Sequence, residues 1–231
     1  MADLAVVQLG QLPYTEALEL QLRVRSARQA DEIGDTLLLL EHPPVYTRGK
    51  RTEAHDLPMG EDWYRAQGIE VHDVDRGGRV TYHGPGQLVG YPIMRISDVI
   101  DYVRTMERAV IAALGDEGID AGVREGLTGI WVSERKIGSI GVHVSKGVTT
   151  HGFAVNVDND LQPFEWVVPC GIEGVRMTSV LQETGRADDT MSCFRKRMAW
   201  RFAEAYGMRQ RLSSIERLTS GADSLELGVV A

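Results

Sequence analysis

The chain has 231 residues, of which 43% are hydrophobic and 25% are charged, the composition of an ordinary globular protein. Its formal net charge of −8 argues against a surface that coats nucleic acid, so we expect no nucleic-acid partner. The longest purely apolar run, Leu37–Leu40, is too short to cross a membrane, so we expect no membrane association either.

Cysteine content and the first residues bear on the compartment. Only two cysteines, Cys170 and Cys193, are present, so no disulfide framework holds this chain together. The opening residues lack the basic region and the long apolar stretch of a signal peptide. We therefore expect a cytoplasmic protein, in whose reducing surroundings a cysteine stays a thiol and can act as a nucleophile.

The first half of the chain is predicted to mix strands with two helices. Strands are expected where short apolar or branched runs are bounded by polar residues, glycine or proline. These runs are Leu4–Leu9, Thr36–Leu40, Ile69–Val74, Val80–His83 and Leu88–Met94. Helices are expected where apolar residues recur every three or four positions, from Tyr14 to about Ile33 and, after an N-cap at Ser97, to about Leu114.

The second half is predicted to contain a strand-rich block, Gly129–Val157, and a helix, Thr190–Tyr206, that Gly207 ends. Strands and helices do not alternate strictly, which favours an α/β (α+β) fold with a mixed sheet. We predict one domain over residues 1–210 and a weakly ordered tail over residues 211–231, where the periodicity fades.

One hairpin within the strand-rich block carries a prediction of register. A two-residue turn at Lys146-Gly147 would set Gly141 opposite Gly152 and Ser139 opposite Ala154. One face of this hairpin would then carry almost no side chains near its middle. Such a face could form a slot for a flat or linear ligand such as an acyl chain, or it could receive a closely packed helix.

Cys170 is the candidate nucleophile, because Pro169 and Gly171 position it sharply. An ordinary cysteine is only slightly ionised at neutral pH, so a neighbouring Lys, His or helix N-terminus would be needed to form the thiolate. The candidates are Lys136, His83, His143 and His151. The histidines show no spacing typical of a metal site, so we expect no metal. Arg48, Lys50 and Arg51 form a short basic loop that could meet an acidic partner.

Several segments in series resemble the lipoyl(octanoyl) transferase family. They are Glu41-His-Pro-Pro-Val-Tyr-Thr, Arg76-Gly-Gly, Thr81-Tyr-His-Gly-Pro-Gly-Gln, Lys136-Ile-Gly-Ser-Ile-Gly-Val-His, His151-Gly-Phe-Ala-Val-Asn-Val and Pro169-Cys-Gly-Ile. The resemblance covers most of residues 4 to about 207 in order. It implies the fold of the biotin and lipoate protein ligase catalytic domain.

The resemblance also implies an activity and its partners. The enzyme would transfer an octanoyl group from acyl carrier protein to a lysine of lipoyl domains. The acceptors would be the lipoyl domains of 2-oxo acid dehydrogenase complexes and the glycine cleavage H protein, in the first step of endogenous lipoate biosynthesis. An acyl-cysteine thioester would be the intermediate, no cofactor would be needed, and we expect a monomer.

The family's functional positions map onto this sequence residue by residue. Cys170 matches the acylated cysteine, and Lys136 matches the lysine that activates it. His143 and His151 are candidates for a supporting role. The substrate-binding positions are Arg76, Gly77, Gly78, Arg79, Val80, Thr81, Tyr82, His83, Ser139, Ile140, Gly141, Gly152, Phe153 and Ala154.

Three other functions are alternatives to this interpretation. An ATP-dependent lipoate or biotin ligase on the same fold would activate the free acid as an adenylate. A thioesterase would give the acyl group to water. A noncatalytic module that binds acyl carrier protein is the third alternative, and the presence of both Cys170 and Lys136 argues against it.

Overall fold

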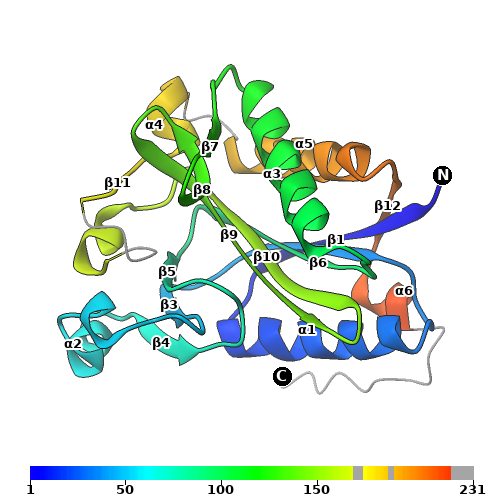
Figure 1. The fold of residues 1–231 in the computed structure, drawn as a ribbon, viewed down its shortest axis with the longest axis horizontal. Helices are drawn as coiled ribbons and strands as arrows, with labels where there is room; N and C mark the ends of the chain where they lie inside the picture. Colours follow the sequence, from blue (N-terminus) through cyan, green and yellow to red (C-terminus); the bar gives the residue numbers. More distant parts are fainter. Residues whose placement is uncertain (169–173, 187–189, 220–231) are drawn as a thin grey trace.

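The computed structural model describes residues 1–168, 174–186 and 190–219 (Figure 1). A large mixed sheet runs through the molecule in the order β12-β1-β2-β6-β10-β9-β8-β7, and β11 pairs with β9. Its strands are β1 (Asp3–Gln11), β2 (Thr36–Glu41), β6 (Gln87–Ile93), β7 (Gly122–Arg124), β8 (Leu127–Val132), β9 (Arg135–Ser145), β10 (Val148–Asn156), β11 (Arg176–Met177) and β12 (Arg209–Ser213). The pairs of β1 with β12, β1 with β2 and β9 with β11 are parallel, and the others are antiparallel. The predicted mixed sheet is confirmed.

Helices cover both faces of this sheet (Figure 1). On one face lies α1 (Tyr14–Gln29), whose buried Ala17, Leu20 and Val24 pack among the branched side chains of β1 and β2. On the other face, α3 (Val99–Gly115) and α5 (Thr190–Ala205) pack together over the largest core cluster. The short helices are α2 (Glu61–Ala66), α4 (Val180–Thr184) and α6 (Ile215–Thr219), and two 3₁₀ turns cover Ala54–Asp56 and Gln162–Trp166. None of the helices in these described ranges is long and apolar enough to cross a membrane.

A second, three-stranded sheet lies beside the first, with β3 (Val45–Arg48) between β4 (Glu70–Asp73) and β5 (Val80–His83). Alternation along β5 separates two sets of side chains. Val80 and Tyr82 enter a cluster of aromatic and aliphatic residues with Phe164, whereas Thr81 and His83 line a pocket on the other side. The small sheet thus has its own core and presents a polar face to the main sheet.

The β9–β10 hairpin has the predicted register. Gly141 pairs with Gly152, Ser139 with Ala154, and the turn residues Lys146 and Gly147 both have positive φ, as a tight two-residue hairpin turn requires. Other parts of the backbone lie against the bare face of the hairpin at Gly141 and Gly152. A Cβ on Gly152 would overlap the carbonyl oxygen of Gly90, and a Cβ on Gly141 would crowd the carbonyl of Gly77. These glycines therefore let the protein's own backbone approach closely.

We expect Gly152→Ala to lower the free energy of unfolding by about 1–3 kcal/mol, because the added methyl group has nowhere to go without separating β6 from β10. The measurement is urea denaturation of both proteins. Gly10→Ala is the matched control, since Gly10 also lies in a strand and nothing is within 4 Å of its Cβ position. Equal stabilities for the two variants would contradict this account of Gly152.

Three boundaries differ from the sequence-based predictions. The N-cap of α3 is Asp98 rather than Ser97, and its carboxylate accepts hydrogen bonds from the backbone N–H groups of Ile100 and Asp101. The helix α1 ends at Gln29, not near Ile33. The chain also stays ordered beyond residue 210, because β12 pairs with β1 and α6 packs against the core on the α1 face. Residues 220–231 of the predicted tail lie outside the described residues.

Candidate active site

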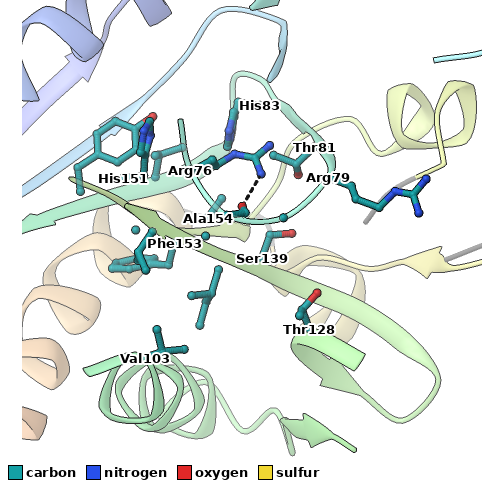
Figure 2. Close-up of a pocket in the computed structure, with 18 of the residues that line it drawn as sticks. Arg76, Arg79, Thr81, His83, Val103, Thr128, Ser139, His151, Phe153 and Ala154 are labelled. Atoms are coloured by element: carbon teal, nitrogen blue, oxygen red, sulfur yellow. Dashed lines mark hydrogen bonds between the residues drawn. The ribbon is translucent and has the colours of Figure 1, made fainter. Parts of the chain in front are cut away.

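A pocket of about 210 Å³ lies between β5, the loop before it, and the β9–β10 hairpin (Figure 2). Most of the predicted substrate-binding positions line it, although they come from distant parts of the chain. These are Arg76, Gly77, Gly78, Arg79, Thr81, His83, Ser139, Ile140, Gly141, Gly152, Phe153 and Ala154. Val80 and Tyr82 do not line it, because their side chains point into the core of the small sheet.

The loop of residues 76–78 is held over the pocket by backbone hydrogen bonds on two sides. Its carbonyls at Arg76 and Gly78 accept from the N–H groups of Lys50 and Arg51, and the Gly77 N–H donates to the carbonyl of Val142. Gly49 permits this approach, since a Cβ there would collide with Gly78. The Gly77 N–H is therefore already paired and is not a donor to a ligand in the pocket.

Arg76 brings a buried positive charge to this pocket. Its guanidinium donates to the hydroxyl and the carbonyl of Thr47 and to the carbonyl of Gly77 (Figure 2). The residue is only 8% exposed. A buried guanidinium held in one orientation suits a carbonyl or phosphate oxygen, because its donors are fixed in a plane.

His83 is neutral and its tautomer is set by its neighbour. Gln87 uses its amide N–H groups on the carbonyl of Tyr82 and the side-chain oxygen of Asn156, so its own side-chain oxygen must accept from His83 Nδ1 at 2.7 Å. Burial, and secondarily the nearby His42, hold the pKa of His83 well below its usual value. Nε2 therefore carries a lone pair, and it makes no hydrogen bond with a described residue.

Behind His83 lies a cluster of rings from four segments of the chain. Tyr14 stacks on His83 and His72, while His42 packs edge-on against His83 at 5.6 Å between centroids. His42 donates from Nδ1 to the carbonyl of Leu12 and accepts the Tyr91 hydroxyl at Nε2. Burial lowers the pKa of His42 to about 4, so this imidazole is neutral at physiological pH.

The depressed pKa of His42 predicts a loss of stability on acidification. The unfolded chain takes up a proton near pH 6.5 and the folded chain only near pH 4, so the contribution is complete above pH 6.5 and fades as pH falls toward 4. We expect His42 to account for about 2 kcal/mol of the decrease in unfolding free energy between pH 7 and pH 5. Urea denaturation at both pH values tests this. His42→Asn should flatten the decrease by that amount, and an unchanged slope would refute the assignment.

Asp75, next to the loop of residues 76–78, contacts two histidines of the β9–β10 hairpin. Its carboxylate accepts from His151 Nε2 at 2.7 Å and lies 3.3 Å from His143 Nε2. The hydrogen bond from His151 lowers the pKa of Asp75 to about 2, while burial lowers the pKa of His151. His151 also has a left-handed backbone (φ 58°), and its N–H donates to the side chain of Gln21. Of the two histidines predicted to play a supporting role, only His151 reaches the pocket itself.

Lys136 is 1% exposed, and a bulge in β9 sets its direction. Ile130 pairs with Gly138 and Trp131 with Lys136, so Ile137 is an extra residue opposite β8. Ile137 and Ile140 both face the core under α3, which leaves Lys136 and Ser139 on the opposite face of β9, the face of Ala154. The ammonium group lies 5.8 Å from the ring centre of Trp131. Gly129 (φ 107°) makes room for it, since a Cβ there would collide with Lys136 Cε.

Cys170, the predicted nucleophile, lies outside the described residues. The described chain after it pairs with the strand of Lys136, whereas the described chain before it is tied to Asp56. The Val168 N–H donates to the carbonyl of Asp56, and Met177 pairs with Lys136 in the parallel β11–β9 ladder. Thr178 N–H then donates to the carbonyl of Lys136.

The predicted basic loop has one member at the pocket. Arg48 is not available to a partner, because it pairs with Glu61 and Asp73. Arg51 is exposed and lines the pocket, while Lys50 is exposed beside it. Sequence reasoning missed other lining residues. Val142 lies within the Lys136–His143 motif but was not singled out, and the rest lie outside the quoted motifs; they are Tyr14, Val89, Tyr91, Val103 and Thr128.

Comparisons with known proteins agree with this geometry. The family model for the lipoyl protein ligase A/B catalytic domain matches residues 13–203. An octanoyltransferase of Salinispora tropica is 48% identical over 80% of this chain and 87% of its own length. One from Solibacter usitatus is 49% identical over 74% and 80%.

Solved structures share the fold at low sequence identity. A putative lipoate protein ligase from T. acidophilum has a TM-score of 0.74 at 22% identity and covers 96% of this chain and 92% of its own. A lipoate-protein ligase A bound with ATP has a TM-score of 0.73 at 23% identity, with the same coverage.

Proposed function

The chain belongs to the octanoyltransferases of the lipoyl protein ligase A/B catalytic-domain family, and from this premise we propose that Cys170 carries the octanoyl group between two protein partners. The donor is octanoyl-acyl carrier protein. The acceptors are lysines of lipoyl domains and of the glycine cleavage H protein. The observation that carries the proposal is identity of 48% to an octanoyltransferase over four-fifths of the chain.

The reaction has two transfers through one thiolate. The Cys170 thiolate attacks the thioester carbonyl of the donor; the carbon–sulfur bond to the carrier breaks, and the carrier leaves as a thiol with a proton from Lys136. The neutral lysine amine of the acceptor then attacks the acyl-cysteine. An amide bond forms, the Cys170–acyl bond breaks, and Lys136 takes up the proton that the amine loses.

Three features of the described residues support this mechanism. Lys136 is almost fully buried, so its amine is shielded from bulk water. The strand β11, which follows Cys170 in the chain, pairs directly with the strand of Lys136. The pocket next to them combines the polar groups of Arg76 and His83 with the apolar side chains of Ile140 and Phe153, as a thioester with an acyl chain requires.

The protein acts as a monomer in the cytoplasm and needs no cofactor. Arg51 at the pocket and Lys50 beside it provide positive charge for the two acidic protein partners.

Incubation with octanoyl-acyl carrier protein, followed by intact-protein mass spectrometry, tests the proposal. We expect one octanoyl increment on the enzyme, which moves to a lipoyl domain when that domain is added. Release of pyrophosphate from ATP and free octanoate would instead indicate a ligase, and free octanoate formed without an acceptor would indicate a thioesterase. Either result without an acyl-enzyme would overturn the proposal.

A further inference from the structure

A buried chain of hydrogen bonds leads away from the pocket through two amide side chains. Gln87 and Asn156 belong to two of the family-like segments and do not line the pocket. Both are 2% exposed. Gln87 accepts from His83 Nδ1 at 2.7 Å and donates to the side-chain oxygen of Asn156 at 3.0 Å. The Asn156 amide donates in turn to the backbone carbonyl of Thr178 at 3.0 Å, so the chain of bonds connects β5 with the residue after β11.

The orientation of both amides is fixed by backbone carbonyls, which can only accept. The carbonyl of Tyr82 takes the amide nitrogen of Gln87, and the carbonyl of Thr178 takes that of Asn156. The side-chain oxygen of Asn156 is then left to accept from Gln87 and from Asn159 at 3.3 Å. Every bond of this network therefore agrees with the others in direction, and reversing either amide would break several of them.

Thr178, at the end of this network, is fully buried, and each of its polar atoms is hydrogen-bonded. Its N–H donates to the carbonyl of Lys136 at 2.9 Å. Its hydroxyl donates to Glu183, whose other carboxylate oxygen accepts from Arg135 at 3.0 Å. Its carbonyl accepts from Asn156. Removal of the Asn156 amide would leave this buried carbonyl without its donor, which favours a shift of the Thr178 backbone.

Asn156 lies where β9 changes partners. The strand β10 pairs with β9 as far as Gly138, and β11 takes over at Lys136. Asn156 is the last residue of β10 and Thr178 is the first after β11, so their hydrogen bond joins the two partners of β9. On the other side of β9, the bulge interrupts the ladder with β8. The position of the Lys136 backbone therefore depends on β11, and that of β11 on Asn156.

We propose that Asn156 is a positioning residue that keeps the amine of Lys136 in place by holding Thr178, and with it β11, against β9. The inference rests on the proton exchange by Lys136 in the proposed octanoyl transfer. Asn156 does not line the pocket, so its loss displaces the acid and base without removing a contact to the substrate. Such a displacement lowers kcat and leaves KM unchanged.

The test is Asn156→Ala. Steady-state transfer from octanoyl-acyl carrier protein to a lipoyl domain gives kcat and KM, NMR measures deuterium exchange of the Thr178 amide, and urea denaturation shows that the variant is folded. We expect kcat to fall about 10–100-fold and KM for the donor to stay within about twofold. The Thr178 amide should exchange at least about tenfold faster, because its local opening becomes easier. Asn156→Leu leaves no cavity and should behave in the same way, which keeps the test available if the alanine variant does not fold.

Asn159→Ala is the matched control. Asn159 is also a buried amide of this network, and it donates to Asn156 and to the carbonyl of Asp160 rather than to Thr178. This variant should keep the wild-type kcat and the wild-type exchange of the Thr178 amide.

Three results would overturn the inference: an unchanged kcat in the folded Asn156 variants, a lower kcat without faster exchange at Thr178, or an equal fall of kcat in Asn159→Ala. A wild-type protein that forms no octanoyl adduct would instead overturn the proposed function. Exchange at Thr178 does not depend on activity, so the two failures are distinguishable.

Discussion

Cys170→Ser should form no acyl adduct and should transfer octanoyl groups at least about a thousandfold more slowly than the wild-type protein. A serine hydroxyl is a much weaker nucleophile than a thiolate at neutral pH, and a lysine that suffices to ionise a thiol does not ionise an alcohol. Intact-protein mass spectrometry after incubation with octanoyl-acyl carrier protein measures the adduct, and a gel-shift or mass assay of the lipoyl domain measures transfer.

Cys193→Ser is the control for Cys170→Ser, because it also removes a thiol but leaves the proposed nucleophile in place. Cys193 is the other cysteine of the chain and is exposed on α5, away from the residues that line the pocket. The Cys193 variant should keep both the adduct and the transfer rate. An octanoyl increment that persists on Cys170→Ser would show that another group is acylated.

Sequence patterns were sufficient where a local rule determines geometry. Alternation of small with branched residues, together with a Lys-Gly turn, predicted the register of the β9–β10 hairpin, because a slip by one residue would turn every side chain to the wrong face. The same alternation does not predict what packs against the bare face. Whether a ligand, a helix or the protein's own backbone lies beyond Gly141 and Gly152 is a tertiary property, and here the backbone of Gly77 and Gly90 approaches them.

Other features of the site could not be predicted, because they depend on distant segments. No spacing in the sequence links Tyr14 to His83, or Asp75 to His151, yet these pairs shape the pocket wall. The β9 bulge that orients Lys136 leaves no mark in the chain, since Ile137 stands between Lys136 and Gly138 as it would in a regular strand. Val80 and Tyr82 were predicted to bind substrate because they lie in a family motif. In a strand, alternate side chains point to opposite faces, so these two point into the core of the small sheet instead.

Lys136→Met should lower the transfer rate by about 10²–10⁴-fold, the usual range for loss of a positioned acid and base. Methionine keeps an unbranched apolar stem of similar length but cannot exchange a proton. At neutral pH the Cys170 thiol should also react more slowly with an alkylating agent, and the difference should shrink as pH rises, because the thiol then ionises without help. Iodoacetamide trapping in the Cys193→Ser background measures this profile.

Stability distinguishes a chemical role of Lys136 from a structural one. Methionine retains the unbranched apolar stem of the lysine, so Lys136→Met should still unfold in one cooperative urea transition while its activity collapses. Lys146→Met, at the exposed hairpin turn, is the control and should leave both properties unchanged. If Lys136→Met kept the wild-type alkylation profile and rate, a group other than this amine would have to activate Cys170.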